Sequence, residues 1–207
     1  MITVIDERNR HLYHDALQNY FRLRHQVFVG RLSWALDAPD GEERDQFDTD
    51  AATYLLAQNA TGEVIAGARM LRTDRPNLLA DVFPFLCDGP APRSPSIWEV
   101  TRLVVDHRKD RLVGCGNVTG SLLCGLLEFG LCVSASHLVS VSDTRIERIL
   151  RMAAWTIRRL GEVHDIDGIP AVAELQALNS EVLNACRAKM RITGNVLSHP
   201  EPTRQAA

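Results

Sequence analysis

The sequence predicts a single α/β domain, built as an α+β sandwich with a mixed central sheet flanked by helices. Segments rich in alternating or β-branched residues occur at 53–58, 64–73, 97–106 and 137–142, whereas apolar residues at helical spacing occur at 10–29 and 114–135. The strands come as a hairpin early in the chain and in strand–helix–strand order later. The length of 207 residues suits one well-buried domain.

In the first half, residues 10–29 predict a helix. Its apolar face consists of Leu12, Ala16, Leu17, Tyr20, Leu23, Val27 and Phe28. Residues 30–50 form a polar loop, and TYLLAQ (53–58), NATGE and VIAGARMLRT (64–73) predict an antiparallel hairpin.

The second half predicts six further elements and leaves 163–178 open. They are a short helix in 77–86, a strand over 97–106, a mostly buried helix over 114–135, a strand over 137–142, and helices over 143–160 and 179–190. Asp143 or Thr144 is expected to cap the helix over 143–160. We expect one domain over 1–197 and a disordered tail over 198–207, because the tail lacks apolar residues able to pack.

The composition argues against several classes of protein. The net charge of −3 does not indicate a nucleic-acid binder. The chain begins without an apolar signal-like segment, and no apolar run approaches the length of a membrane span. The five cysteines include no C-x-x-C pair, which suits reduced thiols. We therefore expect a cytoplasmic protein with no membrane partner.

An acid cluster occupies residues 37–50, DAPDGEERDQFDTD, where seven of the fourteen residues are Asp or Glu. The cluster lacks the spacing of a calcium loop and contains no His or Cys for zinc, so we expect no metal. Trp34 and Phe47 flank it, and acids beside aromatic faces suit a cation with apolar attachments, such as a sulfonium or ammonium group. The alternative is a solvated acidic loop.

A glycine-rich segment, Arg111-Leu-Val-Gly114-Cys-Gly116, lies between a predicted strand and a predicted helix. Glycines expose backbone N–H groups, and a helix N-terminus adds a favourable dipole for an anion. The segment resembles the pyrophosphate-binding loop of GNAT-type N-acyltransferases, which holds a phosphopantetheine thioester. The alternative is a plain glycine-rich turn.

A spaced set of residues resembles a more specific family, the LuxI-type acyl-homoserine-lactone synthases. The segments that carry the resemblance are RHQVFVGRLSW, ERDQFD, GARMLRT and WEVTR, within residues 20–106. Arg72, Thr101, Leu103 and Gly30 depart from the residues common in that family. The resemblance implies a GNAT-like acyltransferase fold and production of a quorum-sensing signal. It implies transfer of an acyl group from acyl carrier protein or acyl-CoA to S-adenosylmethionine (SAM), with lactone closure and release of methylthioadenosine. SAM is then a substrate, and no cofactor is expected.

The resemblance also assigns roles to residues of this chain. The expected SAM-binding residues are Arg24, Phe28, Trp34, Asp45 and Asp48. Glu99 is the expected general base, with an ion pair to Arg69 or Arg102 as its structural alternative. Arg69 and Arg102 are expected to fix the acidic loop, and Phe28 and Trp34 could instead be simple core. We expect Asp48→Asn to abolish synthesis without disturbing the fold.

The expected donor side is less specific. Ser142 could bond a 3-oxo group on the acyl chain, or it could be a capping or core serine. Arg145, Arg148, Arg151 and Arg158 fall on one side of the predicted helix 143–160, where they could dock an acidic carrier protein; the alternative is a solvated basic face. Arg111, Gly114 and Gly116 favour coenzyme A instead; carrier protein is the slightly preferred donor, being commoner in the family.

Two other functions stay open at this point. An ordinary GNAT-type N-acyltransferase that uses acyl-CoA and another amine explains the glycine-rich segment, but not the set from Arg24 to Asp48. A non-catalytic ligand-binding module would bind SAM or a thioester without turnover; the presence of Glu99, Asp45 and Asp48 argues against it.

Overall fold

A mixed β-sheet forms the centre of the computed structural model, which describes residues 1–36, 38, 40–106 and 117–198. The strand order is β6-β8-β5-β4-β3-β2-β1-β9, with β7 paired to β8. The strands are β1 (Ile2–Ile5), β2 (Thr53–Gln58), β3 (Val64–Arg72), β4 (Ile97–Val105), β5 (His137–Asp143), β6 (Ile157–Arg159), β7 (His164–Ile166), β8 (Ile169–Ala177) and β9 (Leu197–Ser198). The β4–β5 and β1–β9 pairs are parallel and the others are antiparallel.

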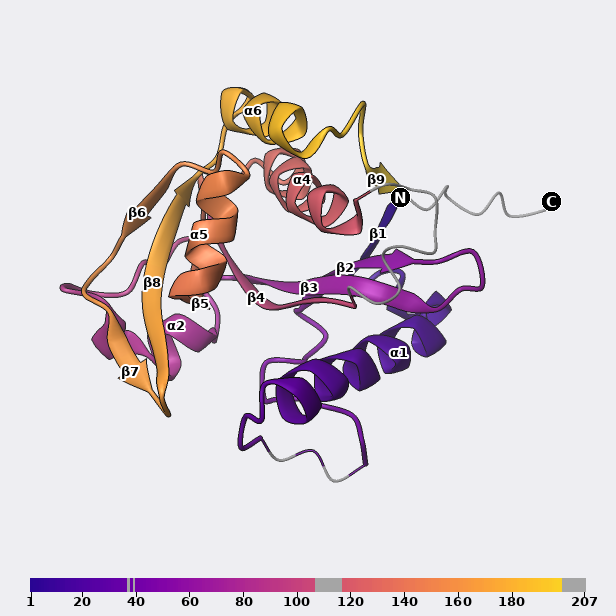
Figure 1. Ribbon diagram of the computed structural model, residues 1–207, viewed down its shortest axis with the longest axis horizontal. Coiled ribbons are helices and arrows are strands. Elements are labelled where there is room, and N and C mark those ends of the chain that lie inside the picture. Colours follow the sequence, from indigo (N-terminus) through magenta and orange to yellow (C-terminus); the bar gives the residue numbers. More distant parts are fainter. Residues whose placement is uncertain (37, 39, 107–116, 199–207) are drawn as a thin grey trace.

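Helices cover both faces of this sheet. They are α1 (His14–His25), α2 (Leu78–Asp81), α4 (Val118–Cys132), α5 (Thr144–Met152) and α6 (Ser180–Met190), with short helical turns η1 (Arg10–Leu12), η2 (Gln26–Arg31) and η3 (Pro84–Leu86). Figure 1 shows α4 and α6 over one face and α1 against the other. The largest apolar cluster lies beneath α4, whose Leu122 and Leu126 are fully buried.

Helix α1 approaches the sheet very closely at Gly67 of β3. A Cβ atom at this position would lie 2.8 Å from the Tyr20 ring and 2.6 Å from a methyl group of Leu56. Only glycine leaves room for the ring, since real Cβ contacts are not this short. This close approach brings α1, which carries Arg24, against β3, which carries Arg69, and β4, which carries Arg102.

Strands β4 and β5 separate partway along their length. They pair only from Ile97 with His137 to Glu99 with Val139, and among the described residues no later pair joins them. Beyond these positions β4 stays on β3 and β5 stays on β8. The two strands therefore diverge directly after Glu99.

The predicted mixed sheet with helices on its faces is confirmed, as are the 53–73 hairpin, the strand 97–106 and the helix 179–190. Asp143 caps α5 by accepting from the Arg145 backbone N–H. β1 was not predicted, because four residues give too short a pattern. Part of the 10–29 prediction was wrong: α1 begins at His14, and Leu12, expected on the apolar face, is 61% exposed.

The prediction of one helix over 143–160 was also wrong. α5 ends at Met152, Ala154 adopts a left-handed φ of 64°, and Ile157–Arg159 then forms an edge strand on β8. Pairing with β8 buries Ile157, and this tertiary contact outweighs the helical propensity of the sequence. Ser198, the first residue of the expected tail, lies in β9; the rest of the tail lies outside the described residues.

Candidate active site

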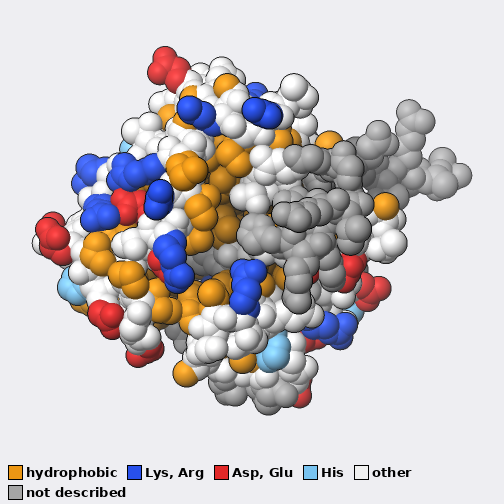
Figure 2. Space-filling model, in the orientation of Figure 1, with side chains coloured by type: hydrophobic (Ala, Val, Ile, Leu, Met, Phe, Trp, Pro, Cys, Tyr) orange, Lys and Arg blue, Asp and Glu red, His pale blue; other side chains and the backbone are white. Residues whose placement is uncertain are grey.

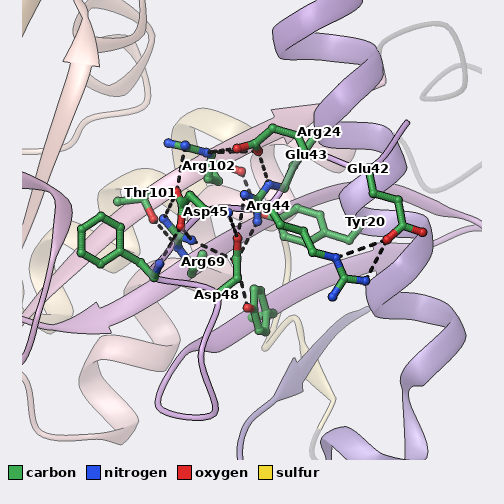
Figure 3. Close-up of polar contacts among 12 residues, drawn as sticks. Tyr20, Arg24, Glu42, Glu43, Arg44, Asp45, Asp48, Arg69, Thr101 and Arg102 are labelled. Atoms are coloured by element: carbon green, nitrogen blue, oxygen red, sulfur yellow. Dashed lines mark hydrogen bonds and ion pairs between the residues drawn. The ribbon is translucent and has the colours of Figure 1, made fainter. Parts of the chain in front are cut away.

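Six charged side chains meet where α1, the loop 42–48 and strands β3 and β4 come together (Figure 3). Three are arginines and three are acids, so the group carries no net formal charge. They are Arg24, Arg69, Arg102, Glu43, Asp45 and Asp48. Burial makes such a group costly unless each charge has a partner, and here every one has.

Arg24 of α1 binds the acidic loop at two points. Its Nε donates to Glu43 at 2.5 Å, and its two terminal nitrogens donate to both carboxylate oxygens of Asp48 at 2.8 and 2.9 Å. The side chains of Arg24, Glu43 and Asp48 are 0%, 1% and 3% exposed. The bidentate geometry fixes the position of the loop relative to α1.

Arg69 of β3 binds the same loop from the sheet side. It donates to both oxygens of Asp45, forms an ion pair with Asp48 at 2.9 Å, and donates from Nε to Thr101 at 3.0 Å. Tyr54 donates its hydroxyl proton to Asp48 at 2.9 Å. Asp48 is therefore held from α1, β2 and β3 at once, and it behaves as the centre of the network.

Arg102 lies at an irregularity in β4. The register with β3 shifts between Gly67 and Arg69, and Arg102 adopts a left-handed φ of 53°. This conformation is uncommon for a residue with a long side chain and is found at functional bulges. The Tyr20 hydroxyl donates to the Arg102 carbonyl at 2.7 Å, and the guanidinium pairs with Glu43 at 3.1 Å and Asp45 at 2.8 Å. The bulge turns Arg102 onto the acidic loop.

The arginines determine the charge state of the acids. Burial opposes ionisation of Asp48, but the hydrogen bonds and charge of Arg24, with the charge of Arg69, lower its pKa below the usual range. Arg69 and Arg102 likewise lower the pKa of Asp45 against the effect of burial. In this network, three arginines of the chain itself neutralise the three acids Glu43, Asp45 and Asp48. Asp45 is the most accessible of the three acids, with 18% of its side chain exposed.

Two aromatic rings border the network. Phe28, in η2, stacks on Trp34 with ring centroids 4.7 Å apart and planes 7° from parallel. The Arg102 guanidinium carbon lies 5.7 Å from the centre of the Phe28 ring. η2 is a π-helical turn, a rare form that often marks functional sites. The widened turn carries Phe28, which lies between Arg102 and Trp34 in these contacts.

Glu99 of β4 is fully buried and is not ion-paired with Arg69 or Arg102. Its two oxygens accept backbone N–H groups at the start of α2, from Leu78 at 2.9 Å and Leu79 at 2.6 Å. Burial raises the pKa of Glu99 to about 7, although the two N–H donors and Arg69 favour the charged form. Glu99 is thus poised to gain or lose a proton near neutral pH.

On the expected donor side, Ser142 lies on β5 with its Oγ buried beside Glu174 of β8. Arg151 and Arg159 both bind Glu147 on α5, whereas Arg158 projects from β6. Arg145, Arg148 and Arg151 lie on α5, but Arg158 does not, so the prediction that one helix carries all four was wrong. Basic side chains still gather over α5 and β6 (Figure 2). They border a surface hollow of about 490 Å³, which Thr144, Glu147, Arg148, Arg151, Met152 and Arg159 line. Arg111, Gly114 and Gly116 lie outside the described residues.

Several residues of the network were missed in the sequence: Glu43, Thr101, Tyr20 and Tyr54. Glu43 lies inside the acid cluster, but the sequence does not distinguish it from Glu42, which pairs with Arg44 near the surface. Tyr20 and Tyr54 read as ordinary core aromatics, because nothing in their spacing reveals a hydroxyl partner. In the described ranges no group of three or more His, Cys, Asp or Glu side chains is arranged to hold a metal ion. None of the helices described is long and apolar enough to cross a membrane.

The chain matches known proteins over most of its length. Residues 8–185 match the model of the family described as "Autoinducer synthase". An acyl-homoserine-lactone synthase of Ralstonia nicotianae is 37% identical over 163 residues, which cover 76% of this chain and 78% of the relative.

Two solved structures resemble the whole fold. The CoA-dependent acyl-homoserine lactone synthase MesI matches with a TM-score of 0.86 and 31% identity, covering 97% of this chain and all of the other. The CoA-dependent synthase BjaI, solved with SAM and isopentyl-CoA, matches with a TM-score of 0.89 and 28% identity over 98% of this chain and 94% of its own.

Proposed function

The chain belongs to the autoinducer synthase family, the acyl-homoserine-lactone synthases with a GNAT-like fold, and we propose that it joins an acyl group from a coenzyme A thioester to SAM. The observation that carries this assignment is the neutral network of three arginines and three acids around Asp45, beside the Phe28–Trp34 stack and Glu99. The similarity to MesI and BjaI supports coenzyme A as the carrier, in place of the carrier protein favoured by the sequence pattern.

SAM binds at Asp45 in this proposal. Its ammonium group pairs with the carboxylate of Asp45, the acid of the network that solvent reaches most easily. The sulfonium lies against the aromatic faces of Phe28 and Trp34, which attract a cation with apolar substituents. Asp48 does not contact SAM; it holds Arg24 and Arg69 so that Asp45 keeps its position.

Glu99 acts as the general base. The ammonium group must lose a proton before it can attack, and Glu99 accepts it directly or through one water. Its pKa of about 7 suits this exchange, and Asp45 is near enough to contribute to raising it. The amine nitrogen then forms a bond to the thioester carbonyl carbon. The C–S bond breaks, and the second amine proton leaves with the thiol.

The separation of β4 and β5 suits the acyl donor. The thioester lies between the diverging strands beside Glu99, where strand-edge N–H groups can stabilise the oxyanion. In the second step a carboxylate oxygen of the acylated SAM attacks its own γ-carbon. The bond from that carbon to sulfur breaks, neutral methylthioadenosine leaves, and the lactone ring closes.

Product analysis tests this function. Purified protein is mixed with SAM and acyl-CoA, and free coenzyme A, methylthioadenosine and lactone are measured by chromatography and mass spectrometry. Equal amounts of the three products are expected. Thiol release from acyl-CoA and another amine, without methylthioadenosine, would instead identify an ordinary N-acyltransferase. Binding of SAM without any product, from acyl-CoA or acyl carrier protein, would identify a non-catalytic module.

A further inference from the structure

The short helix α2 places two backbone N–H groups on Glu99, the proposed base. Leu78 donates to one carboxylate oxygen at 2.9 Å, and Leu79 donates to the other at 2.6 Å. These are the first two residues of a helix that has only four. A helix this short is not stable by itself, because nucleation fixes several residues for one hydrogen bond. Neighbouring groups must therefore hold α2 where its N–H groups meet Glu99.

Asn77, the residue directly before α2, is such a group. It has an extended backbone and is 1% exposed, and its Oδ1 accepts from the Ala80 N–H at 3.0 Å. An α-helix begins with N–H groups that have no partner inside the helix. Asn77 caps the one at Ala80. The N–H groups of the two residues before Ala80 remain for Glu99.

The same side chain connects α2 to the strand that carries Glu99. Its Nδ2 donates to the carbonyls of Thr73 at 3.1 Å and Arg75 at 2.8 Å. Thr73 in turn donates its backbone N–H to the carbonyl of Ile97 at 3.0 Å. Ile97 lies on β4, two residues before Glu99. Both amide protons and the amide oxygen of Asn77 are therefore used, and together these bonds fix the start of α2 relative to β4.

Charged groups around this part of β4 also act on Glu99. Burial raises its pKa, and the two N–H groups of α2 oppose this more strongly than the charge of Arg69 does, whereas Asp45 adds to the increase. Arg69 and Asp45 belong to the charged network of the site. His137 at the start of β5 and Asp81 of α2 are further titratable groups on elements that contact β4. The N–H groups of α2 differ from these groups because they bond both carboxylate oxygens directly.

We propose that Asn77 is a positioning residue for the reaction, which holds α2 so that its two N–H groups keep the carboxylate of Glu99 oriented and ready to accept a proton. This rests on the proposed function, in which Glu99 is the base. Without the Asn77 amide, the start of α2 is released and the carboxylate loses donors that favour its charged form. Glu99 then keeps its proton up to a higher pH, and less of the base is available near neutral pH.

The pH dependence of kcat/KM tests this role. Wild-type protein and Asn77→Ala, with the folded fraction of each checked by circular dichroism, are assayed with acyl-CoA at saturating SAM. In the variant, the midpoint of the rise in kcat/KM should move to higher pH by about one pH unit. The loss is then about tenfold below the wild-type midpoint and becomes smaller above it. A variant with the wild-type midpoint would overturn the proposal, whatever its rate.

Asn179 provides the matched control, because it caps α6, which lies on the face of the sheet opposite α1 (Figure 1). Its side chain accepts from the Val182 N–H at 2.9 Å. Asn179→Ala removes the same kind of cap, so it should lower Tm and leave the midpoint of the pH profile unchanged. If both alanine variants move the midpoint equally, the effect comes from lost stability and the proposal fails.

Asn77→Ser is the conservative variant, which keeps the protein folded if Asn77→Ala does not. Serine can cap α2 but cannot donate to both carbonyls, so the midpoint should move in the same direction by a smaller amount. NMR of the Glu99 carboxyl carbon in isotope-labelled protein, assigned with Glu99→Gln, follows the same proton without turnover. Equal titration of Glu99 in the wild type and Asn77→Ser would refute the role of Asn77.

The products separate this role from the proposed function. If the wild type forms methylthioadenosine and lactone but the midpoints do not differ, the proposed function stands and the role of Asn77 fails. If the wild type forms no methylthioadenosine from any donor, the proposed function has failed, and the role of Asn77 fails with it.

Discussion

Glu43 connects the acidic loop to Arg102, since its carboxylate oxygens accept from Nε of Arg102 at 3.1 and 3.2 Å. The same carboxylate accepts from Arg24, so one acid neutralises two arginines that come from α1 and β4. Arg102 also pairs with Asp45 and lies over the Phe28 ring. By fixing Arg102, Glu43 therefore holds in place two residues that we assign to SAM binding.

The first prediction concerns this residue. Glu43→Gln leaves Arg24 and Arg102 short of one buried countercharge, and we expect the free energy of unfolding to fall by about 3 kcal/mol. For a chain of this size that lowers Tm by roughly 6–12 °C. The KM for SAM should rise by about tenfold, since 1.4 kcal/mol of lost positioning has that effect.

The neighbouring Glu42 provides the matched control. Its side chain is 17% exposed and pairs with the exposed side chains of Arg44 and Arg22. Glu42→Gln should change stability by less than about 0.5 kcal/mol. Thermal unfolding and SAM kinetics of the two variants compare the same chemical change one residue apart. Equal effects at both positions would contradict the role of Glu43.

The second prediction separates Asp45 from Asp48. Asp48 accepts from Arg24, Tyr54 and the Asp45 backbone N–H, so Asp48→Asn should cost about 3 kcal/mol of stability. This differs from our expectation from the sequence, in which the loop contributed little to the fold. Asp45→Asn should destabilise less and raise the KM for SAM by tenfold or more. Urea unfolding and SAM titration distinguish the two, and the reverse order of effects would refute the assignment.

The sequence predicts the strands that carry the site, but it does not predict which charged side chains meet there. The 53–73 hairpin and the strand of Glu99 have clear period-two patterns, so their prediction succeeded. The acid cluster was visible as a charge run, but its partners come from three elements distant in sequence. Spacing cannot show that Arg24, Arg69 and Arg102 meet there. The edge strand at Ile157 was missed because three residues hold no recognisable period, and pairing with β8 determines their form.

The third prediction concerns the proton. If Glu99 is the base, kcat/KM should rise with pH and level off above about 7, because only the deprotonated carboxylate accepts. Glu99→Gln should lower the rate of amide formation by roughly two to four orders of magnitude and remove this rise. Binding of SAM should change far less. Single-turnover measurements across the pH range check it, and a loss below about threefold would make Glu99 a structural cap of α2.

The fourth prediction concerns stability and pH. Burial raises the pKa of Glu99 to about 7, and burial together with the charge of Glu147 raises that of Glu174 to about 7. Each folded acid holds its proton at pH values where the unfolded form, near its ordinary 4.5, has lost it. The unfolded state then binds fewer protons, so stability falls as pH rises from about 4.5 to 7.

Below this range the dependence reverses. The pKa values of Asp45 and Asp48 are lowered, so their contribution is lost as pH falls through and below about 3.8, the ordinary value. Denaturant unfolding should therefore find the stability maximum near pH 4, between these two ranges. Glu174→Gln and Glu99→Gln should each flatten the fall between about 4.5 and 7. If stability rises with pH across that interval, or if neither variant changes the profile, Glu99 and Glu174 are not held in the protonated form by the folded protein.

The last prediction distinguishes the two donors. Arg158 projects from β6 and makes the cleaner charge reversal, because reversing Arg151 would also break its contact with Glu147. If coenzyme A is the donor, Arg111→Ala should raise the KM for acyl-CoA by about tenfold, and Arg158→Glu should change it little. If a carrier protein docks on α5 and β6, Arg158→Glu should instead raise the KM for acyl carrier protein, mainly at low salt, since steering by exposed charges is screened. Both variants are assayed with both donors at two salt concentrations. A wild-type preference for acyl carrier protein, combined with an Arg111→Ala variant that is unaffected with acyl-CoA, would refute coenzyme A as the donor.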